Sequence, residues 1–211
     1  MPRFVVLGRS PRDSRPVLRR YKDKGEIRDV FLVDSIVSKR GLYTFWIASE
    51  SWLPRAFYLV SFDIEGYESK AYSKIKEEMM FNGCAYVDQS TYICPEEVSV
   101  EADRVVTYWV VPVGEARGYL RECFMDTFEW LTALLLATSA KVENADRRAN
   151  RLRKAAESTL AGASVVKFII ERHREKFESI GINVEDAIRG LENAEKTLRE
   201  ALSRKWGNIS R

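Results

Sequence analysis

The chain has 211 residues, 45% of them hydrophobic and 31% charged, with a net charge of +3 at pH 7. This length and composition can bury the core of one large domain or of two small ones. The three cysteines are an odd number without CxxC spacing, which argues against a disulfide framework or a structural zinc site and favours buried free thiols. A single glutamine among many Lys, Arg and Glu residues is typical of a thermophile protein.

Strands and turns are expected in the front half of the chain, because all six prolines lie at or before Pro112. Apolar, β-branched and aromatic runs predict strands over 4–8, 30–37, 42–48, 56–64, 84–94 and 105–113. The second and third runs flank SKRG and are expected to form a hairpin, with a helix over 30–37 as the alternative. A bend is expected at Asp88–Gln89. Helical spacing over 67–82 predicts a helix that ends at Gly83.

Helices are expected in the back half, where apolar residues recur at steps of three and four from Leu120 to Phe177. This narrow stripe is typical of helix packing or a coiled coil, with Gly162 as a candidate break. Gly181 and Asn183 predict a C-cap and an N-cap, after which a last helix over 184–205 folds back. The patterns divide the chain into a basic segment 1–54, a sheet domain 55–113 and a helical domain 114–211.

The location of the protein is predicted from its apolar runs. FVVLG at residues 4–8 is too short for the apolar region of a signal peptide, and arginines follow it. Residues 130–140 are an uninterrupted run of low polarity, but a membrane-spanning helix needs about 20 apolar residues. We therefore expect a cytoplasmic, intracellular protein without a membrane span.

Few residues suit catalysis. The chain has no GxxxxGK[ST], GxGxxG or GxSxG motif, and its only histidine, His173, lies in the apolar helical stripe, where we expect it to be packed. Asp63 ends the strand 56–64, and Glu65, Glu68 and Asp88 lie near it, so a carboxylate site for a divalent metal is one interpretation. The favoured interpretation is that Asp63 is a strand-end residue, with no cofactor and no metal.

Residues 56–95 carry a resemblance to a known group. The stretch SFDI with Asp63, the helix 67–82, Gly83, and QSTYI with Gln89 and Tyr92 resemble the start of the ferredoxin-like domain of CRISPR adaptation nucleases, which also occurs in the C-terminal part of phenylacetate-type repressors. The resemblance implies a βαββαβ-like sheet, dimerisation and a nucleic-acid context. The chain departs from the pattern because it lacks the early helical arginine and because 96–104 leaves little room for the second helix. The expected fold class is α+β: an N-terminal ferredoxin-like antiparallel sheet followed by a long C-terminal helical hairpin or coiled coil.

Two basic segments are candidates for nucleic-acid binding. Residues 1–28 hold nine basic and three acidic residues, a net charge of +6, and residues 141–154 hold six basic and two acidic ones, a net charge of +4. In RRANRLRK, helical spacing places three of the cations on one face, which can follow a phosphate backbone. The alternatives are a solvated surface for the helix, and a winged-helix-like unit for the N-terminal segment. The candidate residues are Arg12, Arg15, Arg19, Arg20, Arg147, Arg148, Arg151 and Lys154.

The favoured function is a non-enzymatic nucleic-acid-binding protein, with DNA or RNA as partner, that dimerises through its long helices. The first alternative is a structural protein that forms homo-oligomers through the C-terminal helices. The second is a metal-dependent nuclease that uses Asp63.

Overall fold

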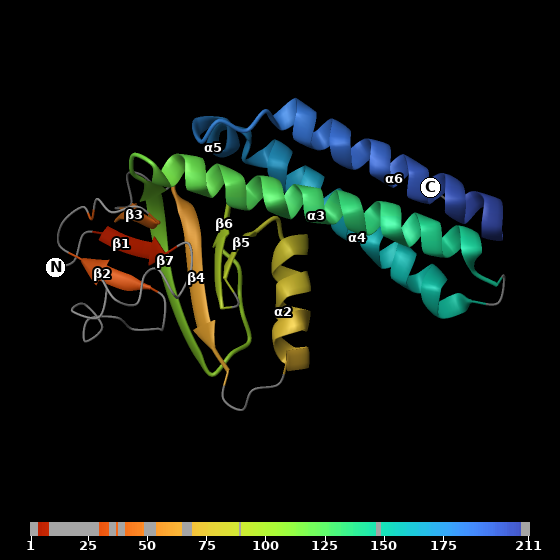
Figure 1. The fold of residues 1–211 in the computed structure, drawn as a ribbon, viewed down its shortest axis with the longest axis horizontal. Helices are drawn as coiled ribbons and strands as arrows, with labels where there is room; N and C mark the ends of the chain where they lie inside the picture. The colour runs from red at the N-terminus through yellow and green to blue at the C-terminus, as the bar shows by residue number, and fades with distance from the viewer. Residues whose placement is uncertain are drawn as a thin grey trace.

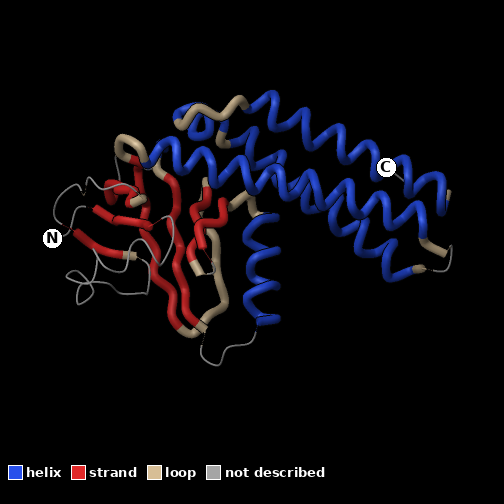
Figure 2. Tube along the Cα trace, viewed as in Figure 1, coloured by secondary structure: helices blue, strands red, loops and turns tan. Residues whose placement is uncertain are grey.

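The computed structural model describes residues 4–8, 30–33, 37, 41–48, 54–64, 69–88, 90–146 and 149–207. A single antiparallel sheet lies at one end of the molecule, and long helices extend away from it (Figures 1 and 2). The predicted α+β class, with strands first and helices second along the chain, is confirmed.

The sheet has seven strands in the order β2-β1-β3-β7-β4-β6-β5, and every neighbouring pair is antiparallel. The inner strand β4 is a continuous apolar run because it is covered on both faces: Phe57 and Leu59 face the main core, whereas Tyr58 and Val60 face a second one. The strands are β1 (Phe4–Gly8), β2 (Phe31–Val33), β3 (Leu42–Ile47), β4 (Phe57–Asp63), β5 (Ala85–Asp88), β6 (Thr91–Cys94) and β7 (Arg104–Pro112).

The predicted hairpin of 30–37 with 42–48 is wrong. Both β2 and β3 pair with β1, so that Phe4 lies opposite Val33 on one side and opposite Trp46 on the other. Residues 31–33 are a strand, which excludes the helical alternative there. An apolar run predicts a strand but does not choose its partner, and here the first strand of the chain lies between the two.

The sheet as a whole does not have the order of a ferredoxin-like fold, because β1, β2 and β3 extend it beyond β7. The second helix of that fold is also missing from its place between β6 and β7. Residues 95–103, which connect the two strands, are not helical. Val98, Val100 and Ala102 of this segment pack on the second core, on the Tyr58 face of β4. The short length of this segment had indicated that a helix would not fit easily.

Helix α2 (Ser69–Phe81) confirms the helix predicted over 67–82. Its Met79 and Met80 are buried, and Gly83 ends it with a φ of 68°, a left-handed conformation that glycine adopts without steric cost. The hairpin of β5 and β6 follows, with a bulge between Tyr86 and Asp88.

The expectation of free thiols is wrong for two of the three cysteines. Cys84, just before β5, and Cys94, at the end of β6, form a disulfide, and only Cys123 is a buried free thiol. The two cysteines are 10 positions apart in sequence, which is not a recognised cysteine motif. The hairpin register nevertheless places them side by side: Ala85 pairs with Ile93, and Cys84 and Cys94 are the next residues outward.

The back half forms four helices: α3 (Ala116–Asn144), α4 (Asn150–Arg172), α5 (Arg174–Ser179) and α6 (Val184–Trp206). The expected break at Gly162 is wrong, since Gly162 lies inside α4; the helices are separated earlier, where α3 ends at Asn144 and α4 begins at Asn150. The predicted caps before the last helix are confirmed: Gly181 has a φ of 84°, and the Asn183 side chain accepts the Asp186 N–H at 3.2 Å.

The helices α3, α4 and α6 pack against one another, and we call this group the helical bundle (Figure 1). The C-terminal helices of the predicted hairpin or coiled coil are confirmed, and α6 folds back along both α3 and α4, which makes a bundle of more helices than a hairpin has. The bundle shares its core with the sheet through an aromatic cluster. Phe124 of α3 lies 5.5 Å from Phe57 of β4 and 5.0 Å from Phe177 of α5, measured between ring centroids.

Candidate nucleic-acid interface

Most of the binding residues predicted from the sequence lie outside the described residues. This holds for Arg12, Arg15, Arg19 and Arg20 and also for Arg147 and Arg148. The structure does place Arg151 and Lys154, both in the first turns of α4 and both exposed. The described part of the predicted site therefore lies at the end of the helical bundle that is remote from the sheet (Figure 1).

Three helix ends meet at this place. Helix α3 ends here, α4 begins here, and contacts to Glu143 fix the last turn of α6 beside them. Arg204 donates to the Glu143 carboxylate at 2.6 Å, and Lys205 Nζ donates to the Glu143 carbonyl at 3.2 Å. We call Lys141, Arg151, Lys154, Arg204 and Lys205 the basic end of the bundle.

The cations of the basic end have two different roles. Arg204 and Lys205 have partners within the protein and offset the partial negative charge at the helix C-termini. Lys141, Arg151 and Lys154 are exposed and make no hydrogen bond or ion pair with any described residue. They are therefore the cations available to a ligand. Sequence reasoning missed Arg204 and Lys205, because only folding brings α6 next to residues 141–154.

The start of α4 adds to this positive potential. No acidic residue lies in its first turn, and its N-cap residue, Ala149, has no side chain that can accept a backbone N–H. The first N–H groups of a helix have no partner within the helix and carry the positive end of its dipole. Arg151 and Lys154 lie around these groups, so both the backbone and the side chains favour an anion there.

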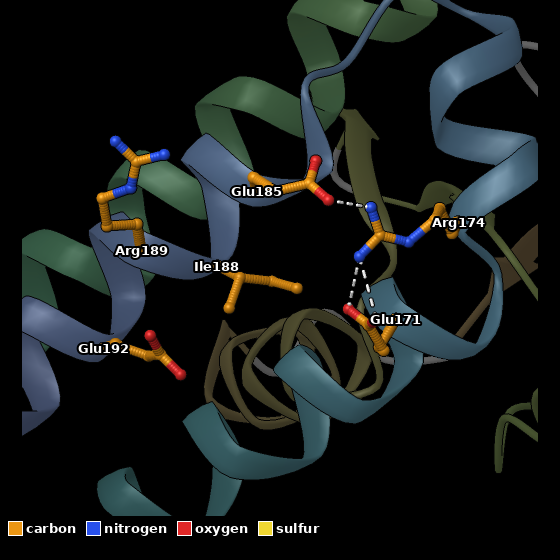
Figure 3. Close-up of a pocket in the computed structure, with 6 residues that line it drawn as sticks. All are labelled: Glu171, Arg174, Glu185, Ile188, Arg189 and Glu192. Carbon is orange, nitrogen blue, oxygen red and sulfur yellow. Dashed lines mark hydrogen bonds and ion pairs between the residues drawn. The ribbon is translucent and has the colours of Figure 1, made fainter.

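The opposite end of the bundle has a different electrostatic arrangement. A shallow pocket there is lined by Glu171, Arg174, Glu185, Ile188, Arg189 and Glu192 (Figure 3). Arg174 is held between Glu171, at 2.9 Å, and Glu185, and these hydrogen bonds raise the pKa of its guanidinium. Arg189 pairs with Asp186 at 3.1 Å. Both arginines of this pocket are thus neutralised by acids of the protein.

Asp63 ends β4 as the favoured interpretation predicted, opposite Arg104 of β7. One of its carboxylate oxygens accepts the Ile64 N–H at 3.2 Å. Asp88 is similarly engaged with the Ser90 N–H at 3.0 Å. Glu65 and Glu68 lie outside the described residues. Among the residues that the structure does describe, no group of three or more His, Cys, Asp or Glu side chains could hold a metal ion.

Sequence reasoning also missed a polar cluster where the bundle meets the sheet. Glu96 accepts from Arg172 at 3.2 Å and contacts His173 Nε2 at 2.9 Å, so the lone histidine has a polar partner at the helix end. Lys176 Nζ donates to the Pro95 carbonyl at 2.6 Å, although this lysine is 93% buried. Burial lowers the pKa of Lys176 to about 8, against the opposing effect of Glu96. These contacts join residues 76 to 81 positions apart, so no local motif indicates them.

No protein-family model, curated protein or solved structure matches this chain. Within the described part of the chain, no helix combines the length and apolar character needed to cross a membrane.

Proposed function

We propose that the protein binds nucleic acid through the basic end of its helical bundle. The observation that carries this proposal is a pair of exposed cations, Arg151 and Lys154, at the start of α4, where no side chain caps the helix. Neither cation has a partner among the residues that the structure describes. Cations in such a position bind phosphates and release counterions from the nucleic acid. The binding free energy gained in this way does not depend on the nucleotide sequence. The sequence adds Arg147 and Arg148 immediately before this turn.

The distribution of ion pairs supports this assignment over a uniformly charged surface. Arg174 and Arg189 at the opposite end of the bundle are paired with carboxylates, whereas Arg151 and Lys154 form no ion pair with a carboxylate in the described part of the chain. Exposed cations such as Arg151 and Lys154 at one end of an elongated bundle raise the local concentration of a polyanion there. Phosphate contacts of this kind position the ligand but do not read bases.

The proposal is tested by the salt dependence of affinity for short oligonucleotides. The double variant Arg151→Gln/Lys154→Gln should weaken binding and reduce the slope of log K against log salt by about 1.8 for two lost contacts to duplex DNA. The matched control is Lys74→Gln/Arg189→Gln, which removes the same charge from exposed, paired positions. Equal affinities of the two double variants, or no binding by the parent protein at low salt, would overturn the proposal.

A second candidate function, homo-oligomeric assembly, is supported by an exposed apolar pair on α4. Val165 and Phe168 are one turn apart on the same side of the helix and are 45% and 64% exposed. Apolar contacts are insensitive to salt screening, so this assembly should persist in high salt. Phe168→Asp should lower the molar mass measured by light scattering, and a parent protein that is monomeric at all concentrations would exclude this function.

We also propose a relationship of the sheet domain to ferredoxin-like sheets. Within the larger sheet, the strands of residues 57–112 follow the order β7-β4-β6-β5, and α2 connects β4 to β5. This partial arrangement supports a relationship to ferredoxin-like sheets, in which a βαβ unit and a hairpin combine in the same way. The nuclease alternative has less support, since the described residues include no group of three or more His, Cys, Asp or Glu side chains that could hold a metal ion. Unchanged cleavage by Asp63→Asn would exclude this alternative.

A further inference from the structure

An open apolar row lies along the exposed side of α4. It consists of Ala161, Val165 and Phe168, which follow one another at steps of four and three residues and therefore share one side of the helix. Val165 is 45% exposed and Phe168 is 64% exposed, and Ala161 is exposed as well. Because every member of the row is exposed, a second helix can cover it along its whole length.

Opposite charges lie at the two ends of this row. Arg172 lies four residues after Phe168, and Glu157 lies four residues before Ala161. The side chains of Arg172 and Glu157 are 58% and 40% exposed, and each forms an ion pair within the chain, at 3.2 Å and 2.9 Å respectively. A guanidinium has five N–H donors and a carboxylate accepts several hydrogen bonds, so each group can take a further partner.

Two such rows complement each other when the helices run antiparallel. With a two-fold axis at the middle of the row, Phe168 lies opposite Ala161 of the partner subunit. A large side chain then meets a small one, which lets the two helices approach closely. The same axis places Arg172 opposite Glu157 of the partner subunit, so the charges are complementary too. A parallel pair would instead place the two Arg172 side chains beside each other, where like charges repel.

We infer that two copies of the chain pair antiparallel through this row on α4, and that the pair holds one nucleic-acid duplex with both of its basic ends. The inference rests on the proposed function and combines it with the assembly supported by the exposed apolar pair. Arg151 and Lys154 precede Glu157, which lies opposite Arg172 of the partner subunit. Because α4 ends at Arg172, the partner helix stops before it reaches these two cations.

The length of α4 sets the spacing between the two basic ends. In the antiparallel pair the two copies of Arg151 are about 40 Å apart along the helices, at a rise of 1.5 Å per residue. Residues related by the two-fold axis lie on the same face of the dimer, so one straight ligand can reach both. Duplex DNA rises about 3.4 Å per base pair and is stiff over this length, so a duplex of about 12 base pairs spans the distance.

Cysteine cross-linking of the full-length chain tests the antiparallel pairing. Val165 lies beside the two-fold axis, so Val165→Cys should form a disulfide between subunits in air. Ala161→Cys should not, because its two copies lie about 10 Å apart along the helices, whereas a mixture of Ala161→Cys and Phe168→Cys should form a mixed dimer. Cys123 is buried, which leaves the introduced thiol as the reactive one. No cross-linking of Val165→Cys, or equally efficient cross-linking of Ala161→Cys alone, overturns the inference.

The length dependence of duplex binding tests the contact with both basic ends. Fluorescence anisotropy compares duplexes of 8 and 16 base pairs, which are about 27 and 54 Å long. The parent should bind the longer duplex roughly 100-fold more tightly, the lower end of the range for two linked contacts. Val165→Ser/Phe168→Ser removes the apolar row without a change of charge and should lose most of this preference. Circular dichroism melting checks that this variant is folded.

Leu136→Ser is the matched control, because it replaces another exposed apolar side chain, on α3, and should keep the preference for the longer duplex. Equal preferences in the parent and in Val165→Ser/Phe168→Ser, or an equal loss in Leu136→Ser, overturn the inference and leave the proposed function intact. If the parent binds neither duplex at low salt, the proposed function fails together with the inference.

Discussion

The ring of Phe81, at the end of α2, occupies the space that a side chain at position 162 of α4 would need. A Cβ atom built on Gly162 would lie 2.3 Å from Phe81 Cδ1 and 2.6 Å from Cε1. Glycine inside a helix costs about 1 kcal/mol relative to alanine. At this position the lack of a side chain allows α2 to approach α4 closely, which explains why a residue that disfavours helices lies inside one.

Gly162→Ala is therefore expected to destabilise the protein although it improves helix propensity. Overpacking a filled site costs typically 1–3 kcal/mol, which exceeds the gain of about 1 kcal/mol from the alanine. Urea unfolding followed by circular dichroism measures the difference.

The matched control is Gly190→Ala on α6, where an added Cβ meets nothing within 4 Å. Without a clash, this variant should gain about 0.5–1 kcal/mol of stability. Equal stabilities for the two alanine variants would show that Phe81 does not restrict position 162.

The Lys167–Glu195 ion pair between α4 and α6 provides a second prediction. The two charged groups are 2.9 Å apart, Glu195 is 95% buried, and Ser164 donates a further hydrogen bond to it at 3.4 Å. Lys167→Ala leaves a buried carboxylate without its cation, which should cost about 3 kcal/mol, the lower end of the range for buried pairs because Lys167 is partly exposed. The double variant Lys167→Met/Glu195→Leu should recover most of this loss. If the losses in free energy of unfolding from the two single variants add up in the double variant, Lys167 and Glu195 are not energetically coupled.

Lys176 gives a pH dependence of stability with a defined sign. Its folded pKa is about 8, below the unfolded value of about 10.4. Between these values the unfolded chain binds more protons than the folded one, so stability from this residue increases as the pH rises. Below pH 8 the full cost of burying the charged amine is present.

This pH dependence is measured as the difference between Lys176→Met and the parent, since other groups titrate in the same range. Burial also raises the pKa of Cys123 to about 11, which has the opposite effect above its unfolded pKa, but this contribution cancels in the difference. The stability of Lys176→Met relative to the parent should fall by about 2 kcal/mol from pH 8 to pH 10. A difference that stays constant would show that Lys176 is solvated in the folded protein.

The Cys84–Cys94 disulfide leads to a chemical prediction. Denatured chains without reductant should expose one reactive thiol, from Cys123, and three after reduction. Replacing both bridged cysteines by serine should cost about 2–3 kcal/mol, because a loop of this length restricts the unfolded chain modestly. Three thiols before reduction would show that the hairpin forms without the bond.

Local features were predictable from the sequence, and nonlocal ones were not. The helix α2, its end at Gly83 and the Asn183 cap depend on neighbouring residues, so pattern and propensity identify them. The position of β1 between β2 and β3, the approach of Phe81 to Gly162 and the Cys84–Cys94 disulfide depend on which segments meet after folding. For the same reason the sequence indicated Arg151 and Lys154 but missed Arg204 and Lys205.

The two outermost strands of the sheet are poor templates for edge-to-edge aggregation. β2 has only 3 residues, and β5 has 4 and is distorted by its bulge at Tyr86–Asp88. Amyloid-like growth needs a long, flat edge strand with a row of unpaired amide and carbonyl groups, and neither β2 nor β5 is such a strand. This β-rich half should therefore stay dispersed at high concentration, and any ordered self-association should use side-chain surfaces rather than strand addition.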